Sequence, residues 1–274
     1  MTLIVGWLAC DQRRQCSAYI ASDSRISDNI NCYDNSQKLF AFKNTPDILG
    51  YCGETLFTYQ ILTRLTNMCD AKMLLTPEMD YRERSDIILG EIKKAHSVYK
   101  LNGGSIRIYH IGRNNQRLFQ ANFYDWNGIV WTNIEIETDY NKSMKLFSDG
   151  SGKKEFEERF LDFKFGNNEG TSRNYFHCFC DVIKNVKDRH TGGIPQLVGL
   201  YNGTKFNGMY HGTIIDDKAY YEALEVENIY EMSNIRWYNE NFEICNGNTK
   251  QRQIGAMAQP VSKRQLPDSP FSKV

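Results

Sequence analysis

The sequence of 274 residues has no long hydrophobic run, no net charge at neutral pH and no obvious metal-binding motif. Because it contains no stretch of 18 or more apolar residues, we expect no membrane span. Lysine plus arginine and aspartate plus glutamate number 33 each, which argues against a protein that binds nucleic acid through a broad basic surface. The apolar start of the chain is interrupted from Asp11 to Arg14, which argues against a signal peptide.

The eight cysteines form neither an evident disulfide framework nor a zinc motif. Without a secretion signal, we expect reduced thiols in a cytoplasmic protein. The densest group, His177-Cys178-Phe179-Cys180, lacks the Cys-x-x-Cys spacing of a tetrahedral site. We therefore predict that these cysteines are buried on a helix face, and we predict no metal and no other cofactor.

Apolar periodicity predicts groups of strands separated by two pairs of helices. Helices are expected over 57–68, from Pro77 to 99, over 156–163 and over 175–186. Strands are expected at 2–10, 16–25, 38–42, 48–52, 105–112, 117–125, 129–137, 145–147, 195–202, 209–215 and 219–226. Two sheets with helices outside would explain this order, so we predict an α+β fold, a four-layer αββα sandwich.

Nothing in the pattern divides the chain before residue 247. Residues 248–274 hold three of the six prolines, show little periodicity and carry an excess of basic residues. We therefore predict one domain over 1–247 and a flexible or loosely docked tail over 248–274.

The first residues of the chain carry a possible nucleophile. Methionine aminopeptidase usually removes Met1 before a small residue, and the mature chain would then begin with Thr2. A terminal threonine combines a hydroxyl with an α-amine that can accept the hydroxyl proton. A threonine at this position is common, so the later polar clusters decide its meaning.

Six segments occur in the order found in the proteasome β-subunit family of N-terminal nucleophile hydrolases, and the chain resembles that family, including its bacterial proteasome-related branch. The segments span residues 2–202 and are Thr2-Leu3-Ile4-Val5-Gly6, Ala21-Ser22-Asp23-Ser24-Arg25, Lys38 in Gln37-Lys38-Leu39-Phe40, Gly50-Tyr51-Cys52-Gly53, Gly150-Ser151-Gly152, and Asp188-Arg189-His190-Thr191-Gly192-Gly193. The family has the αββα fold predicted above.

The resemblance implies a role for each matching residue. Thr2 would be the nucleophile and its own amine the general base, with Lys38 beside the hydroxyl and Asp23 holding Lys38. The Gly53 amide would stabilise the oxyanion. The terminal amine would be placed by Ser151, Asp188 and Thr191. Residues on the substrate side would be Arg25, Cys52, Glu54 and Gly192; Glu54 departs from the small residue usual there and could narrow or charge the pocket.

Each segment alone has a plainer explanation. Asp23-Ser24-Arg25 resembles a turn, Lys38 a solvated lysine, and Ser151 a helix cap. Taken together, they favour a threonine peptidase that acts on peptides or proteins. The resemblance to the family further implies assembly into a homo-oligomeric ring or spiral and allows an ATPase partner, which nothing in the sequence specifies. The alternatives are an amidase for a small non-peptide substrate and a non-catalytic scaffold or assembly subunit.

Overall fold

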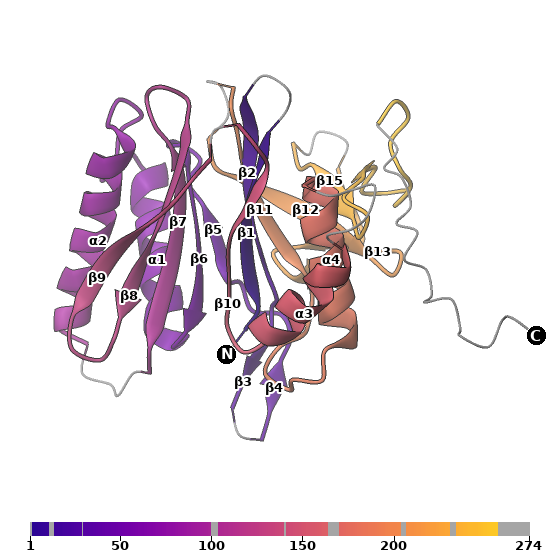
Figure 1. The fold of residues 1–274 in the computed structure, drawn as a ribbon, viewed down its shortest axis with the longest axis horizontal. Coiled ribbons are helices and arrows are strands. Elements are labelled where there is room, and N and C mark those ends of the chain that lie inside the picture. Colours follow the sequence, from indigo (N-terminus) through magenta and orange to yellow (C-terminus); the bar gives the residue numbers. More distant parts are fainter. Residues whose placement is uncertain are drawn as a thin grey trace, which may run out of the picture.

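A computed structural model describes residues 2–10, 14–28, 30–99, 104–139, 141–163, 170–203, 207–230 and 234–256. Within these ranges the fold is a mixed α/β arrangement with two main sheets, a small hairpin and four helices (Figure 1). The helices are α1 (Leu56–Asp70), α2 (Tyr81–Ser97), α3 (Lys153–Phe163) and α4 (Ser172–Asn185).

The larger sheet contains nine strands within the described residues, and its main path runs in the order β10-β1-β2-β11-β12-β13-β14. These strands are β10 (Met144–Asp149), β1 (Ile4–Cys10), β2 (Gln15–Ser22), β11 (Gln196–Tyr201), β12 (Met209–Ile215), β13 (Lys218–Tyr221) and β14 (Leu224–Glu225). Beside β12 lies β15 (Trp237–Asn239), which pairs with β16 (Ile244–Cys245).

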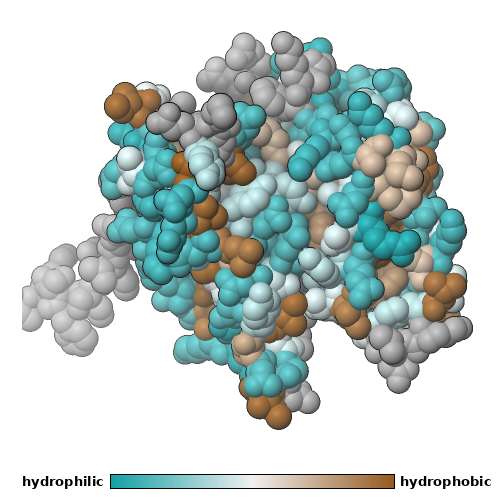
Figure 2. All heavy atoms as spheres, turned by 180° about the vertical axis from the view of Figure 1, so that it is seen from behind, coloured by the Kyte–Doolittle hydropathy of each residue, from teal (hydrophilic) through white to brown (hydrophobic). Residues whose placement is uncertain are grey.

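The smaller sheet has five strands in the described part of the chain, in sequence order. They are β5 (Leu39–Ala41), β6 (Asp47–Gly53), β7 (Ile106–Arg113), β8 (Phe119–Trp126) and β9 (Trp131–Ile136). A separate hairpin of β3 (Ile26–Ser27) and β4 (Cys32–Tyr33) projects from the body (Figure 1). Figure 2 shows hydrophobic surface on this projection, and Ile30 is 83% exposed there.

Alternation along the strands explains how the layers pack, because successive side chains of a strand point to opposite faces. On β1, Val5 and Trp7 join the apolar cluster with α3 and α4, whereas Ile4 and Leu8 join a cluster shared by both sheets. A further cluster joins α1 and α2 to the smaller sheet, for example through Ile61. Each fully buried side chain of this kind contributes about 1.5–3 kcal/mol.

Two details of the predicted elements are wrong. The second helix does not start at Pro77: α2 begins at Tyr81, after Asp80 in an extended conformation, and a turn closed by Met79 N–H donating to Thr76 O precedes it. The sequence prediction also missed the β3–β4 hairpin and β15–β16, because strands of two or three residues are too short to show alternation.

The first residues beyond the predicted domain boundary at 247 are hydrogen-bonded to the fold. The side-chain amide of Asn248 donates to Ile229 O at 2.7 Å, and Gln253 N–H donates to Ile244 O at 2.9 Å. Residues 257–274, the rest of the tail predicted over 248–274, lie outside the described residues, so the boundary at 247 stays a prediction. None of the helices that the structure describes is both long and apolar enough to cross a membrane.

Candidate active site

Thr2, Asp23 and Lys38 come together in one buried group. The Lys38 ammonium Nζ donates to Thr2 Oγ1 at 2.7 Å, to Asp23 Oδ1 at 2.8 Å and to Arg25 O at 2.5 Å. The Thr2 hydroxyl also donates to Asp23 Oδ1. Thr2 is 1% exposed, Asp23 0% and Lys38 2%, so these contacts are shielded from solvent.

The pairing of β1 with β2 places Asp23 beside the start of the chain. Ile4 pairs with Ser22, so the residues just outside this pair lie opposite each other. Asp23 N–H donates to Leu3 O, and Leu3 N–H donates to Asp23 Oδ1, both at 3.1 Å. Gly192 N–H donates to the other carboxylate oxygen at 3.0 Å. The Asp23 carboxylate is therefore held by backbone donors as well as by lysine.

Lys38 reaches this group from the other sheet, because it directly precedes β5. Its own backbone is held by Gln196 at the start of β11: Lys38 N–H donates to Gln196 Oε1 at 3.1 Å. The Gln196 amide nitrogen donates to Asp23 O at 3.1 Å and to Ser36 O at 2.9 Å. Gln196 thus joins the two sheets at the site, a role that the sequence did not reveal.

Burial and charge act in opposite directions on Lys38. Burial lowers the pKa of Lys38, the adjacent Asp23 carboxylate raises it, and the net pKa lies below the ordinary lysine value. A lysine of this kind gives up a proton more readily than a solvated one. The arrangement can therefore stabilise a threonine alkoxide or exchange a proton with the hydroxyl.

Ser151, Thr191 and Asp188 form a second hydrogen-bonded group. The Ser151 and Thr191 hydroxyls are 3.1 Å apart, and the Thr191 hydroxyl donates to Asp188 Oδ2 at 2.8 Å. Burial raises the pKa of Asp188, but the hydrogen bonds to its carboxylate, of which that from Ser151 has the largest effect, lower the pKa more. The pKa of Asp188 therefore lies below its usual value. Gly152 N–H donates to Thr2 O at 3.2 Å, which joins this segment to Thr2. The predicted placement of a free Thr2 amine by these residues stays a prediction.

The backbone conformation and close surroundings of Gly53 suit only glycine. Its φ is +105°, and a Cβ there would lie 2.0 Å from Ser105 O. The next residue, Glu54, caps α1: its carboxylate oxygens accept from Leu56 N–H at 2.8 Å and Phe57 N–H at 2.9 Å. Glu54 thus stabilises the start of the helix, and its predicted effect on a substrate pocket stays a prediction.

Arg25 braces the turn that carries Asp23. It binds Asp34 through two hydrogen bonds of 2.6 and 2.8 Å and donates to Thr191 O at 3.3 Å. Gly192 has φ +152°, and a Cβ there would lie 2.7 Å from Arg25 Cζ. Glycine at 192 therefore lets the arginine pack against the loop whose amide binds Asp23.

Asp149 is the other contributor that sequence reasoning missed. Its Oδ2 accepts from Arg107 at 2.6 Å, from Tyr109 at 2.7 Å and from the Cys52 thiol at 3.3 Å. Burial raises the pKa of Asp149, but the hydrogen bonds to its carboxylate, of which that from Tyr109 has the largest effect, lower the pKa more. The pKa of Asp149 therefore lies below its usual range. Burial also raises the pKa of Cys52, so the thiol stays protonated and can donate.

The Asp149 carboxylate joins β10 of the larger sheet to β6 and β7 of the smaller sheet. Asp149 precedes Gly150, where a Cβ would lie 2.1 Å from Thr2 O, and Cys52 precedes Gly53. A signal was available, because Asp149 is adjacent to the matched Gly150-Ser151-Gly152 segment.

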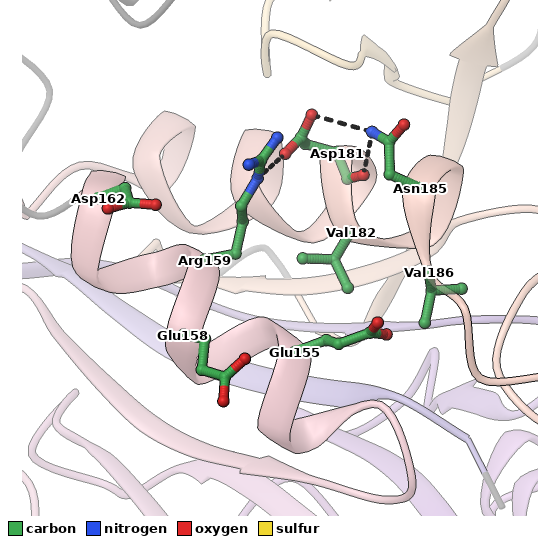
Figure 3. Close-up of a pocket in the computed structure, with 8 residues that line it drawn as sticks. All are labelled: Glu155, Glu158, Arg159, Asp162, Asp181, Val182, Asn185 and Val186. Carbon is green, nitrogen blue, oxygen red and sulfur yellow. Dashed lines mark hydrogen bonds and ion pairs between the residues drawn. The ribbon is translucent and has the colours of Figure 1, made fainter. Parts of the chain in front are cut away.

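A cavity of about 460 Å³ between α3 and α4 lies apart from these groups (Figure 3). Its described lining contains four acidic residues and Arg159, which forms an ion pair with Asp181 at 2.5 Å. None of the described residues that line it belongs to the Thr2 site. The predicted burial of Cys178 and Cys180 on a helix face is confirmed on α4.

Comparison with solved structures shows a fold of the proteasome-like kind. One such structure is a mutant of Anbu from Hyphomicrobium sp. strain MC1, which matches with a TM-score of 0.53 at 13% sequence identity. The match covers 83% of this chain and 89% of that chain. No family model matches the sequence, and no curated protein matches it. At this identity the likeness concerns the fold alone.

Proposed function

We propose that the chain is a threonine-type N-terminal nucleophile hydrolase that cleaves amide bonds, with peptides as substrates, through an acyl-enzyme on Thr2. The fold in this proposal is the four-layer αββα sandwich of that class, in its bacterial proteasome-related branch. The observation that carries the proposal is the buried contact of Lys38 Nζ with Thr2 Oγ1 at 2.7 Å and with Asp23 Oδ1 at 2.8 Å.

The mechanism begins once Met1 is removed, because Thr2 then gains a free α-amine with an ordinary pKa near 8. The amine accepts the hydroxyl proton, assisted by Lys38, while Oγ1 bonds to the substrate carbonyl carbon. The Gly53 N–H stabilises the resulting oxyanion, and one such donor is worth about 3–4 kcal/mol. The C–N bond then breaks, the leaving amine takes the proton, and water hydrolyses the ester.

The family resemblance extends the proposal beyond the chemistry. By this resemblance we propose that the protein is cytoplasmic, assembles into a homo-oligomeric ring or spiral with its active sites facing inward, acts on peptides or proteins, and needs no cofactor. Native mass spectrometry of the purified protein tests the assembly, and a strictly monomeric protein would contradict this extension.

The experiment that tests the activity is an intact-mass measurement before and after treatment with a peptide epoxyketone. We expect a mass that lacks Met1, followed by one adduct mapped to Thr2. Lys38→Ala provides the control, because it retains Thr2 but removes the contact at its hydroxyl. An adduct that forms equally fast in Lys38→Ala would refute the role given to the lysine.

A second candidate is a non-catalytic scaffold, and the 1% exposure of Thr2 favours it. A hydroxyl this well covered is closed to substrate unless processing at Met1 opens it. Complete retention of Met1 with no adduct would favour the scaffold. Loss of Met1 without an adduct would instead favour an amidase for a small non-peptide substrate.

A further inference from the structure

A cavity of about 480 Å³ adjoins the segments that form the Thr2 site. Its lining comes from the β3–β4 hairpin, the segment before Lys38, the start of α1 and the turn between β13 and β14. The volume falls within the range of sites that enclose small ligands, about 300–1,000 Å³. The cavity is therefore large enough for one amino-acid side chain.

The chain connects this cavity to the proposed chemistry on two sides. Ser36 and Gln37 line it and directly precede Lys38. On the other side, Thr55 lines it two residues after Gly53. A group held in the cavity would thus lie beside both the segment that carries the lysine and the segment that carries the predicted oxyanion donor.

The described lining combines aliphatic, aromatic and neutral polar side chains with a single carboxylate. Leu56 and Leu224 supply aliphatic surface, and Tyr33 and Tyr59 supply ring surface. Among the described lining residues, Glu222 alone has a side chain that is charged at neutral pH. A long side chain with an apolar stem and a positive end matches this distribution.

Glu222 is held against the site by its own turn. It lies between β13 and β14 with φ +49°, and Asn35 Nδ2 donates to Ala223 O at 2.7 Å. Burial raises the pKa of Glu222, although a hydrogen bond with Tyr221 and the positive charge of Lys43 lower it in part. This desolvated carboxylate would gain from a cation brought by a ligand.

The neighbouring Glu225, unlike Glu222, has a cationic partner. It forms an ion pair with Lys218 at 3.0 Å on the surface. The ion pairs found among the described residues do not include Glu222. Two glutamates three residues apart thus differ in partner, burial and access to the cavity, which makes Glu225 a matched control.

We propose that this cavity, the Glu222 pocket, binds a lysine or arginine side chain of the substrate next to the scissile bond. The alkyl stem packs on Leu56 and Leu224, the positive end pairs with Glu222, and Tyr33 and Tyr59 flank it. The assignment to a substrate rests on the proposed hydrolase function. Binding of a cation in the pocket does not, because it needs no turnover.

Calorimetric titration of the full chain with N-acetyl-arginine amide and N-acetyl-norleucine amide tests the pocket directly. We expect the arginine derivative to bind about tenfold more tightly, as a desolvated charge pair allows. Glu222→Gln should remove this preference, and Glu225→Gln should keep it. Equal binding of the two compounds to the unmodified protein, or an unchanged preference in Glu222→Gln, would overturn the inference.

Hydrolysis of fluorogenic peptides that differ only in arginine or norleucine before the cleaved bond separates the two proposals. A preference for arginine of about tenfold that disappears in Glu222→Gln supports both. Hydrolysis without that preference overturns the inference and leaves the hydrolase. Selective binding of arginine without hydrolysis of any peptide supports the pocket and refutes the hydrolase.

Discussion

Replacing Lys38 with methionine removes a buried charge while nearly conserving the length of the side chain. Asp23, which is 0% exposed, would lose its cation but keep the Leu3 and Gly192 amide donors. Removing one partner of a buried ion pair costs about 3–5 kcal/mol. Because two amide donors remain, we expect Lys38→Met to lower the free energy of unfolding by about 3 kcal/mol, at the lower end of that range.

The opposite change, Asp23→Asn, should cost less. Burial lowers the pKa of Lys38, and the Asp23 carboxylate opposes that effect. Without the carboxylate, the pKa falls further, and the lysine can lose its proton instead of remaining a buried charge. We expect a cost of about 1–3 kcal/mol, the penalty for poorly satisfied buried polar groups.

The double variant should cost less than the sum of the single variants, because it leaves no unpaired charge. Urea denaturation of the four proteins at pH 7 gives the coupling free energy, which we expect to be about 2 kcal/mol or more. A coupling within about 0.5 kcal/mol of zero would refute the buried ion pair. The same preparations test the chemistry: the mechanism is wrong if folded Lys38→Met or Lys38→Ala keeps substantial activity.

Three other substitutions test separate parts of the structure. Gly53→Ala should cost about 1–2 kcal/mol or more in urea denaturation and reduce turnover, because the residue has φ +105° and a methyl group would meet a backbone oxygen at 2.0 Å. Asp149→Asn should lower kcat about tenfold with little change in KM, because it loosens the contact of β10, which leads into the segment that binds Thr2 O, with β6, which carries the predicted oxyanion donor. Asp125→Asn removes the other carboxylate bound by the same arginine and should change neither value, and equal losses would contradict a positioning role. Arg84→Met should lower the free energy of unfolding by about 3–5 kcal/mol, because it leaves the buried Asp47 carboxylate without the positive charge of the arginine. Burial raises the pKa of Asp47, but the charge of Arg84 and the contacts with His110 lower it more, so the folded pKa lies below the ordinary value of about 3.9. The carboxylate therefore stabilises the fold above that ordinary pKa, and this contribution is lost as the pH falls through the lower folded pKa. An identical dependence of stability on acid pH in Arg84→Met would refute that account.

The sequence predicted the long elements because each has a clear apolar period. Helices α1, α3 and α4 and the strands from β6 to β9 lie where that period placed them, with ends shifted by a few residues. The start of α2 was misplaced because Pro77 suits a first helical turn, whereas the chain forms a separate turn before Asp80. Short strands such as β3 and β4 depend on tertiary contacts and give no periodic signal.

At the site, local motifs identified Thr2, Asp23 and Lys38, and the structure brings them into direct contact. Local motifs did not identify Gln196 or Asp149, although both hold the same region together. A single polar residue at the end of a strand resembles a solvated one in sequence. Its importance arises only from a partner on another strand, often many residues away.

The residues of the candidate chemistry and the apolar faces of the elements could be predicted from residue type and short-range spacing alone. The tertiary structure decided that Lys38 and Asp23 are buried together, that Glu54 caps α1, and that Glu222 lies beside the segment before Lys38. These outcomes depend on how the two sheets and their turns approach one another. That approach is determined by packing over the whole domain, so no local pattern contains it.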